Sequence, residues 1–213
     1  IRFSTKFNIT STGNIDAKNF DLSNLKNNGY IQGLNEKSNN IRFNSGQIKL
    51  SGNKLIFEKP EILISEGLVK LNGSITNYLS KHPQNNFYAS LKDINLENLN
   101  LILNKIKFKN STLKNGLIIA KNNEIKFDSF NMVYQNMPLF VNAQIKNIFA
   151  KKTLIANFST IITEQTADNT INAFLVTPIK IKNEIPIKGS FSGQSDNYTM
   201  NIVTKIPKEA DIS

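Results

Sequence analysis

The chain has 213 residues, a net charge of +10 at pH 7, no cysteine and one histidine. The lack of cysteine excludes disulfides, thiolate metal sites and a cysteine nucleophile. His82, alone in the polar stretch SKHPQNN, cannot build a histidine triad or a multi-histidine metal centre, so we expect no metal, no cofactor and a surface position for this residue. The lysines occur singly among Ile, Leu and Phe, without a basic and aromatic patch, which argues against a nucleic-acid partner.

The first predicted element is a short helix at 20–29, FDLSNLKNNG, capped by Asp21 and ended near Gly29. From residue 41 onward the apolar residues recur at every second position, as in half-buried strands. The stretch LVKLNGSITN at 68–77 is typical, with Gly73 in its middle and Asn77 at its end.

The alternation changes parity twice between residues 55 and 75, and such a change marks a turn or a bulge. EKPE at 58–61 and SEG at 65–67 have turn chemistry, because Pro presets φ and Gly permits positive φ. We therefore predict turns at both places. Strands joined by links this short can pair only antiparallel, which predicts a meander.

Helical signals remain few further along the chain. NLENLNLILNKI at 95–106 is the best candidate, with Asn95 as its N-cap and leucines at helical spacing. ADNTINAFLV at 167–176 fits either a helical turn or a strand. No stretch approaches the roughly 18 apolar residues of a membrane-spanning helix.

The strand pattern repeats along the chain. A slide of 70 places LVKLNGSITN on PLFVNAQIKN at 138–147 and makes DSFN and QNMP the turns of a second unit, and a slide of 116 places the same strand on EIPIKGSFSG at 184–193. We predict repeats at roughly 41–105 and 106–165 with a partial copy at 170–213. The chain starts at Ile1 within strand rhythm, which suggests one segment, 1–213, of a longer protein.

A sheet with one apolar and one polar face must bury the apolar one. It can do so as a sandwich, a barrel, a solenoid, or a curved trough that holds an apolar ligand. Leaving many large apolar side chains in water would cost on the order of tens of kcal/mol. Periodicity alone leaves these alternatives open.

The phrase VKLNGSITN…FYASLKDINLENLNLIL resembles the repeating unit of the AsmA-like superfamily, which includes TamB and YhdP. In that unit a strand with a central Gly and a final Asn is followed by a polar loop, an alternating strand and a leucine-spaced element, here Asp93, Ile94, Leu96 and Leu99. The resemblance is best over residues 41–163, with an echo at 185–206.

This resemblance implies a mainly β fold, in which an extended antiparallel meander sheet with one or two short helices is curled into an open groove. The parent protein would lie in the periplasm of a Gram-negative-type bacterium, anchored in the inner membrane by parts outside this segment, and would conduct phospholipid towards the outer membrane. Gly73, Ala143 and Gly189 would let the sheet bend. The groove lining would be Leu55, Phe57, Ile62, Ile64, Val69, Leu71, Ile75, Ile125, Phe127, Met132, Tyr134, Leu139, Val141, Ile145, Ile185, Ile187 and Phe191.

Other classes of protein compete with this interpretation. A carboxylate-based enzyme would depend on Glu58, Glu61, Glu66 or Asp93, but the first three read as solvated turn residues and Asp93 as a helix start, so we expect no enzyme. A lipopolysaccharide-transport jellyroll bridge would also hold lipid in an apolar trough. A closed β-sandwich surface or adhesin domain would use the same residues as an ordinary core.

Overall fold

The described part of the chain is one antiparallel sheet. The structure is a computed structural model that describes residues 3–12, 26–36, 41–64, 66–97, 110–134, 136–167, 181, 183–194 and 197–204, with the backbone alone for 3–12, 26–36 and 41. Each strand pairs with its neighbours in the chain, so the sheet order is the chain order. The strands are β1 (Phe3–Thr12), β2 (Lys26–Glu36), β3 (Ile41–Gly52), β4 (Lys54–Ile64), β5 (Gly67–Thr76), β6 (Gln84–Asn95), β7 (Ser111–Asn122), β8 (Glu124–Tyr134), β9 (Met137–Lys146), β10 (Thr153–Ile162), β11 (Ile185–Gln194) and β12 (Asn197–Thr204).

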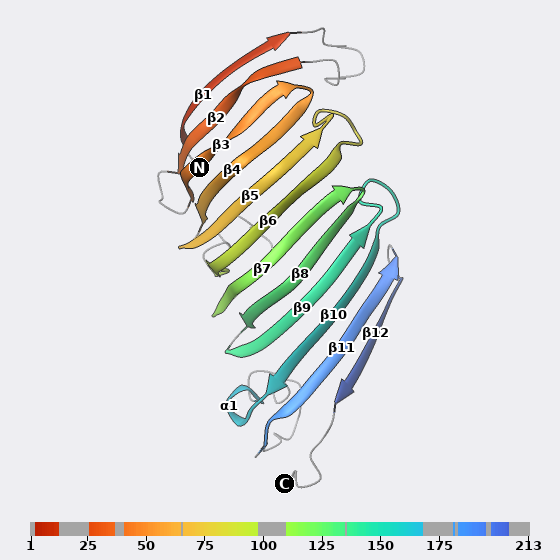
Figure 1. Cartoon of the computed structure of the whole chain (residues 1–213). Coiled ribbons are helices and arrows are strands. Elements are labelled where there is room, and N and C mark those ends of the chain that lie inside the picture. Colours follow the sequence, from red (N-terminus) through yellow and green to blue (C-terminus); the bar gives the residue numbers. More distant parts are fainter. Residues whose placement is uncertain are drawn as a thin grey trace.

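The sheet is open. The strands lie side by side in a single twisting layer from β1 to β12, which form its two edges (Figure 1). The surface area of 14195 Å² exceeds the roughly 9,900 Å² expected for a compact monomer of this mass, in keeping with described strands that all belong to one extended sheet. The predicted mainly β, antiparallel meander is confirmed. The helix in the described residues is α1 (Glu164–Ala167), which is far too short to span a membrane.

The backbone repeats with the period expected from the sequence. β7, β8 and β9 begin at residues 111, 124 and 137, which is 70 residues after β3, β4 and β5 at 41, 54 and 67. The slide of 116 aligns β11 with β5. In the sheet, however, β11 follows β10 as β7 follows β6, so β11 takes the place of β7 in the repeat and not that of β5. Residues with positive φ recur at the same spacing, in the pairs Gly52 and Asn122, Lys59 and Ser129, Glu66 and Asn136, and Asn77 and Asn147.

Two of the predicted turns are wrong. EKPE lies inside β4 and DSFN lies inside β8, and in both places the pairing register shifts without ending the strand. The cause is a β-bulge: Lys59 (φ 48°) and Ser129 (φ 53°) each insert one residue in the left-handed region, which restores the apolar residues to the same face. The turns predicted at SEG and QNMP are present, with Glu66 and Asn136 at positive φ between consecutive strands.

The predicted helices fare differently. Residues 26–29 of the first candidate belong to β2, and residues 20–25 lie outside the described part. Asp93 is a positive-φ residue within β6 rather than a helix start. Asn95 ends β6, and its Oδ1 accepts a hydrogen bond from the Glu97 backbone N–H (3.0 Å), as an N-cap side chain does, while residues 98–106 lie outside the described part. Ala167 ends α1, and residues 168–176 lie outside the described part.

Buried side chains gather toward one end of the strands, where β6 leads to β7 and β10 leads to β11. One cluster contains Val69, Ile94 and Leu113 together with Leu96, which follows β6 and donates its backbone N–H to Ser111 O (2.9 Å). The other contains Ile162 of β10, Ala167 of α1 and Ile181. Residues of these two connections therefore pack on the sheet at this end.

Candidate functional site: an apolar sheet face

One face of the sheet carries a row of alternating apolar residues on every described strand from β3 to β12. Residues that lie directly opposite one another in an antiparallel pair share a face, so the register can be followed from strand to strand. Val69 lies opposite Ile62 and Leu91, and Leu71 lies opposite Ala89. We call the residues in register with Val69 the apolar face.

All predicted lining residues fall on this face. On β4 and β5 these are Leu55, Phe57, Ile62, Ile64, Val69, Leu71 and Ile75; on β8 and β9 they are Ile125, Phe127, Met132, Tyr134, Leu139, Val141 and Ile145; and on β11 they are Ile185, Ile187 and Phe191. The pairs Ala89–Ile118 and Ile118–Phe127 connect the first set to the second, and Ala156–Phe191 connects β10 to β11. That they line a groove remains a prediction.

The sequence-based set missed the strands between the listed ones. Leu50, Phe87, Ile118, Leu154 and Phe158 lie on the same face. FYASL and LIANF carried the signal, since they alternate as the predicted strands do. Lining residues were therefore predicted on too few strands, although every residue that was predicted lies on this one face.

The apolar face bears no formal charge. Among the described residues of β3 to β12 that pair in register on this face, none is Lys, Arg, Asp or Glu. Most of its large side chains are half-buried, and toward the β12 edge Met200 and Ile202 are exposed by 56% and 58%. The face therefore offers a continuous apolar surface that its own chain covers only in part.

The small residues on this face make room for aromatic rings. Gly73 lies opposite both Phe57 and Phe87, whose rings meet edge to face with centroids 5.4 Å apart. A Cβ at Gly189 would overlap the ring of Phe158, and Ala143 lies opposite Phe127. Gly73 also has φ +119°, whereas Ala143 and Gly189 are not among the positive-φ residues. The bend predicted at these three positions remains a prediction.

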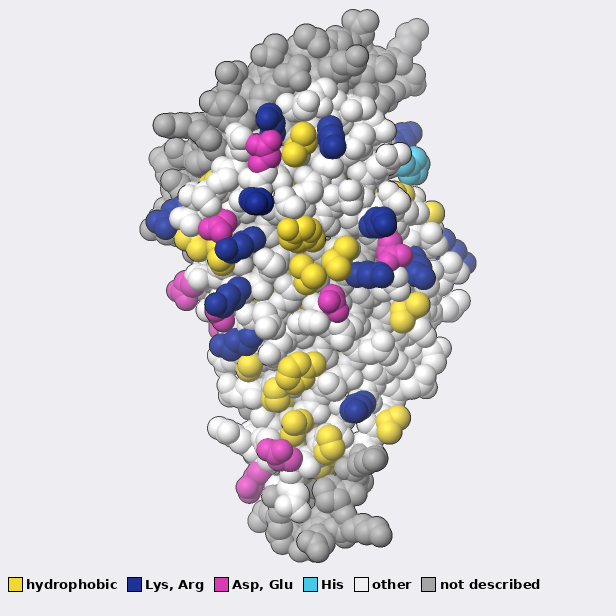
Figure 2. Space-filling view, viewed as in Figure 1, with side chains coloured by type: hydrophobic (Ala, Val, Ile, Leu, Met, Phe, Trp, Pro, Cys, Tyr) yellow, Lys and Arg dark blue, Asp and Glu magenta, His cyan; other side chains and the backbone are white. Residues whose placement is uncertain are grey.

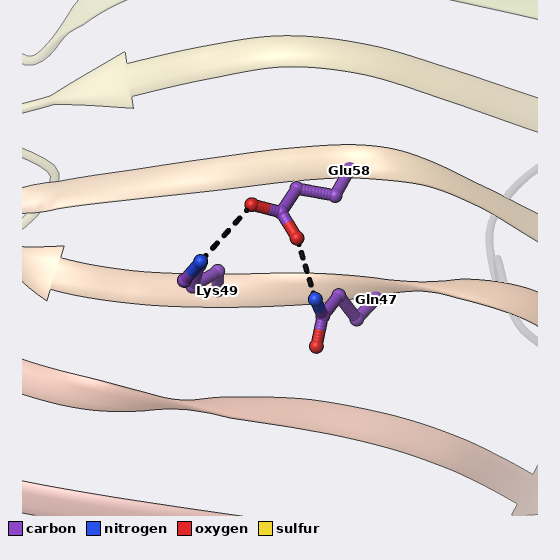
Figure 3. Close-up of polar contacts among 3 residues, drawn as sticks. All are labelled: Gln47, Lys49 and Glu58. Atoms are coloured by element: carbon purple, nitrogen blue, oxygen red, sulfur yellow. Dashed lines mark hydrogen bonds and ion pairs between the residues drawn. The ribbon is translucent and has the colours of Figure 1, made fainter.

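Charges occupy the other face, which we call the polar face. Figure 2 shows Lys, Arg, Asp and Glu side chains scattered singly over it, with hydrophobic groups between them. Glu58 of β4 accepts hydrogen bonds from Gln47 Nε2 (2.5 Å) and Lys49 Nζ (3.3 Å) of β3 (Figure 3). Glu61 pairs with Lys70 Nζ across β4 and β5 at 2.7 Å.

These contacts predict the titration of Glu58. The hydrogen bond from Gln47, followed by that from Lys49, holds the pKa of Glu58 below its ordinary 4.5. A carboxylate with a lowered folded-state pKa stabilises the fold above its unfolded-state pKa, and this contribution is lost as the pH falls through the folded-state value. In Gln47→Leu, the ¹³C NMR titration midpoint of the Glu58 carboxyl should rise toward 4.5. Glu124, whose partner Gln144 is retained, should titrate as before, and an unchanged Glu58 midpoint would contradict the assignment.

The candidate catalytic acids are not gathered in one pocket. Glu58 and Glu61 lie on the polar face of β4, Glu66 occupies the β4–β5 turn, and Asp93 lies at the irregular position of β6. His82 is exposed in the β5–β6 connection. Within the described residues, no group of three or more His, Asp or Glu side chains could hold a metal ion.

Comparison with known proteins adds no relative: no family model, no curated protein and no solved structure matches this chain. The apolar face is therefore interpreted from its own geometry.

Proposed function

We propose that the chain is a segment of a cell-envelope protein whose apolar face carries phospholipid acyl chains between the inner and outer membranes, without catalysis. The observation that carries the proposal is the uncharged face that runs across the strands of an open single-layer sheet. The envelope location, with a parent protein in the periplasm anchored in the inner membrane, rests on the resemblance of residues 41–163 to the AsmA-like superfamily.

Acyl chains suit this surface energetically. Each methylene that leaves water for an apolar surface contributes about 0.8 kcal/mol, so one acyl chain laid on the face gains on the order of 10 kcal/mol before ordering is subtracted. The polar face keeps its lysines in water, which leaves the two faces with separate roles. Binding of this kind is passive and needs no reacting group.

The described strands favour the trough over a closed sandwich. A sandwich buries its core between two facing sheets, whereas all twelve strands belong to one sheet whose edges do not meet. A lipopolysaccharide-transport jellyroll bridge would share the apolar trough and differ in its cargo.

Lipid extraction tests the proposal. The chain is produced in a Gram-negative host, purified without detergent and extracted for mass spectrometry. We expect phospholipid to co-purify in a fixed ratio to protein. Co-purifying lipopolysaccharide would favour the jellyroll bridge, and a lipid-free protein that unfolds in one cooperative transition would contradict the proposal.

A further inference from the structure

One end of the sheet forms a continuous rim, built from the connections at residues 53, 77–83, 123 and 147–152. It lies to the right in Figure 1. Asn53 Nδ2 donates to Asn77 Oδ1 (2.6 Å), which joins the first two connections. The His82 ring meets the Phe149 ring edge to face with centroids 5.7 Å apart, and the Phe149 backbone N–H donates to Asn123 Oδ1 (3.2 Å). The four connections therefore form one surface.

Two of these connections repeat the same short motif. Residues 77–81 read Asn-Tyr-Leu-Ser-Lys, and residues 147–151 read Asn-Ile-Phe-Ala-Lys. Both begin at an Asn with positive φ, and both close with a backbone hydrogen bond of 2.9 Å, from Ser80 N–H to Asn77 O and from Ala150 N–H to Asn147 O. Each loop thus places two half-buried apolar residues next to an exposed lysine.

The rim is basic. None of its residues is Asp or Glu, and Glu124 of β8, which follows the rim residue Asn123, accepts from Gln144 Nε2 (2.6 Å), pairs with Lys126 Nζ (3.6 Å) and lies opposite Lys146. Figure 2 shows dark blue side chains, the colour of Lys and Arg, along this edge. The lysines of the rim are Lys81, Lys151 and Lys152; all three are exposed, and none forms an ion pair with another described residue.

The rim borders the apolar face directly. Lys152 precedes Leu154 of the apolar face by two residues, so an anion held by this lysine lies within roughly 7 Å along the strand of an apolar-face side chain, whereas Lys54 and Lys146 are strand neighbours of Leu55 and Ile145 and project to the polar face. At the opposite end, Leu96, Ala167 and Ile181 pack against residues of the apolar face.

We infer that this lysine rim holds the phosphate-bearing headgroups of anionic phospholipids whose acyl chains lie on the adjacent apolar face. The inference rests on the proposed function and adds a substrate class to it. Exposed lysines near anionic lipid each strengthen association about fivefold, and a headgroup without net charge gains far less from them. The chain therefore selects anionic over zwitterionic phospholipid.

Two lipids with the same acyl chains test this selection. Binding of dioctanoyl-phosphatidylglycerol and dioctanoyl-phosphatidylcholine to the full chain is measured by calorimetry, with inorganic phosphate as a third ligand. We expect phosphatidylglycerol to bind at least about fivefold more tightly than phosphatidylcholine. The triple variant Lys81→Gln/Lys151→Gln/Lys152→Gln should bind both lipids equally and keep its affinity for phosphatidylcholine.

A matched variant controls for net charge. Lys92→Gln/Lys114→Gln/Lys188→Gln removes the same charge from exposed positions outside the rim and should keep the preference. The inference is overturned if this control loses the preference as the rim variant does, if wild-type protein binds both lipids equally, or if inorganic phosphate alone binds as tightly as the anionic lipid. If neither lipid binds, the proposed function and this inference are both overturned.

Discussion

Val141→Asp or Leu71→Asp should reduce lipid loading about a hundredfold while strand content stays largely intact. Both residues are half-buried on the apolar face, Val141 opposite Phe130 and Phe158, and Leu71 opposite Ala89. A carboxylate placed among acyl chains costs about 2.5–3.5 kcal/mol, which corresponds to that loss of affinity. Without lipid, the same carboxylate remains within reach of water. Bound phospholipid per protein is measured by mass spectrometry, and strand content by circular dichroism.

The neighbouring residues supply the control. Asn142 and Asn72 lie one position away on the polar face, so Asn142→Asp and Asn72→Asp introduce the same charge without entering the apolar face. The carboxylate of Asn142→Asp can still accept the backbone N–H of Ser129, as Asn142 Oδ1 does at 2.7 Å. These variants should load lipid as the wild type does. Unfolding of both apolar-face variants, with both controls folded, would mean that the face is a closed core.

Gly73→Ala should destabilise the fold by about 3 kcal/mol or more, although Ala143 occupies the equivalent place in the second repeat. Gly73 has φ +119°, which side chains rarely adopt, and an added Cβ would overlap Asn86 O and lie 2.5 Å from Phe87 Cα. These are backbone atoms of the paired strand β6, so they cannot turn aside as a flexible side chain can. The free energy of unfolding is measured by urea titration.

Gly52→Asn is the matched control for a positive-φ glycine. Gly52 has φ +60°, nothing lies within 4 Å of an added Cβ, and Asn122 holds the corresponding position with φ 51°. Asn tolerates the left-handed region, so this variant should change stability by no more than about 0.5 kcal/mol. If Gly73→Ala and Gly52→Asn lowered the free energy of unfolding equally, the positive φ alone, and not contact with β6, would account for the loss of stability.

The apolar face could be predicted from the sequence because apolar residues recur at every second position, and neighbouring strands share this pattern. Leu55 and Ile62 have opposite parity and nevertheless lie on one face. The sequence could not say whether a bulge or a turn joins them. The bulge residues Lys59 and Ser129 are neither Gly nor Asn, and Pro60 beside Lys59 imitates a turn signal. Pairing with the flanking strands, and not the residue types at these positions, determines that each is a bulge and not a turn.

The lysine rim was beyond the reach of sequence reasoning for a different reason. His82 and Phe149 are 67 residues apart, and they meet only because the β5–β6 and β9–β10 connections lie at the same end of the sheet. In the sequence the lysines stand singly, as on a solvated strand face. They come together only because the connections that carry them lie at the same end of the sheet. The positions of individual strand ends, and not composition, create this basic edge.

Photo-crosslinking from the two faces tests the central claim most directly. p-Benzoylphenylalanine replaces Phe127 or Phe158 on the apolar face, and Tyr88 or Phe140 on the polar face, in protein produced and irradiated in cells. Exposure alone would favour the polar-face probes, because Tyr88 and Phe140 are 47% and 45% exposed while Phe127 and Phe158 are half-buried. The account predicts phospholipid adducts from Phe127 and Phe158 and none from Tyr88 and Phe140. Adducts from the polar face alone, or only intramolecular crosslinks from the apolar face, would contradict it.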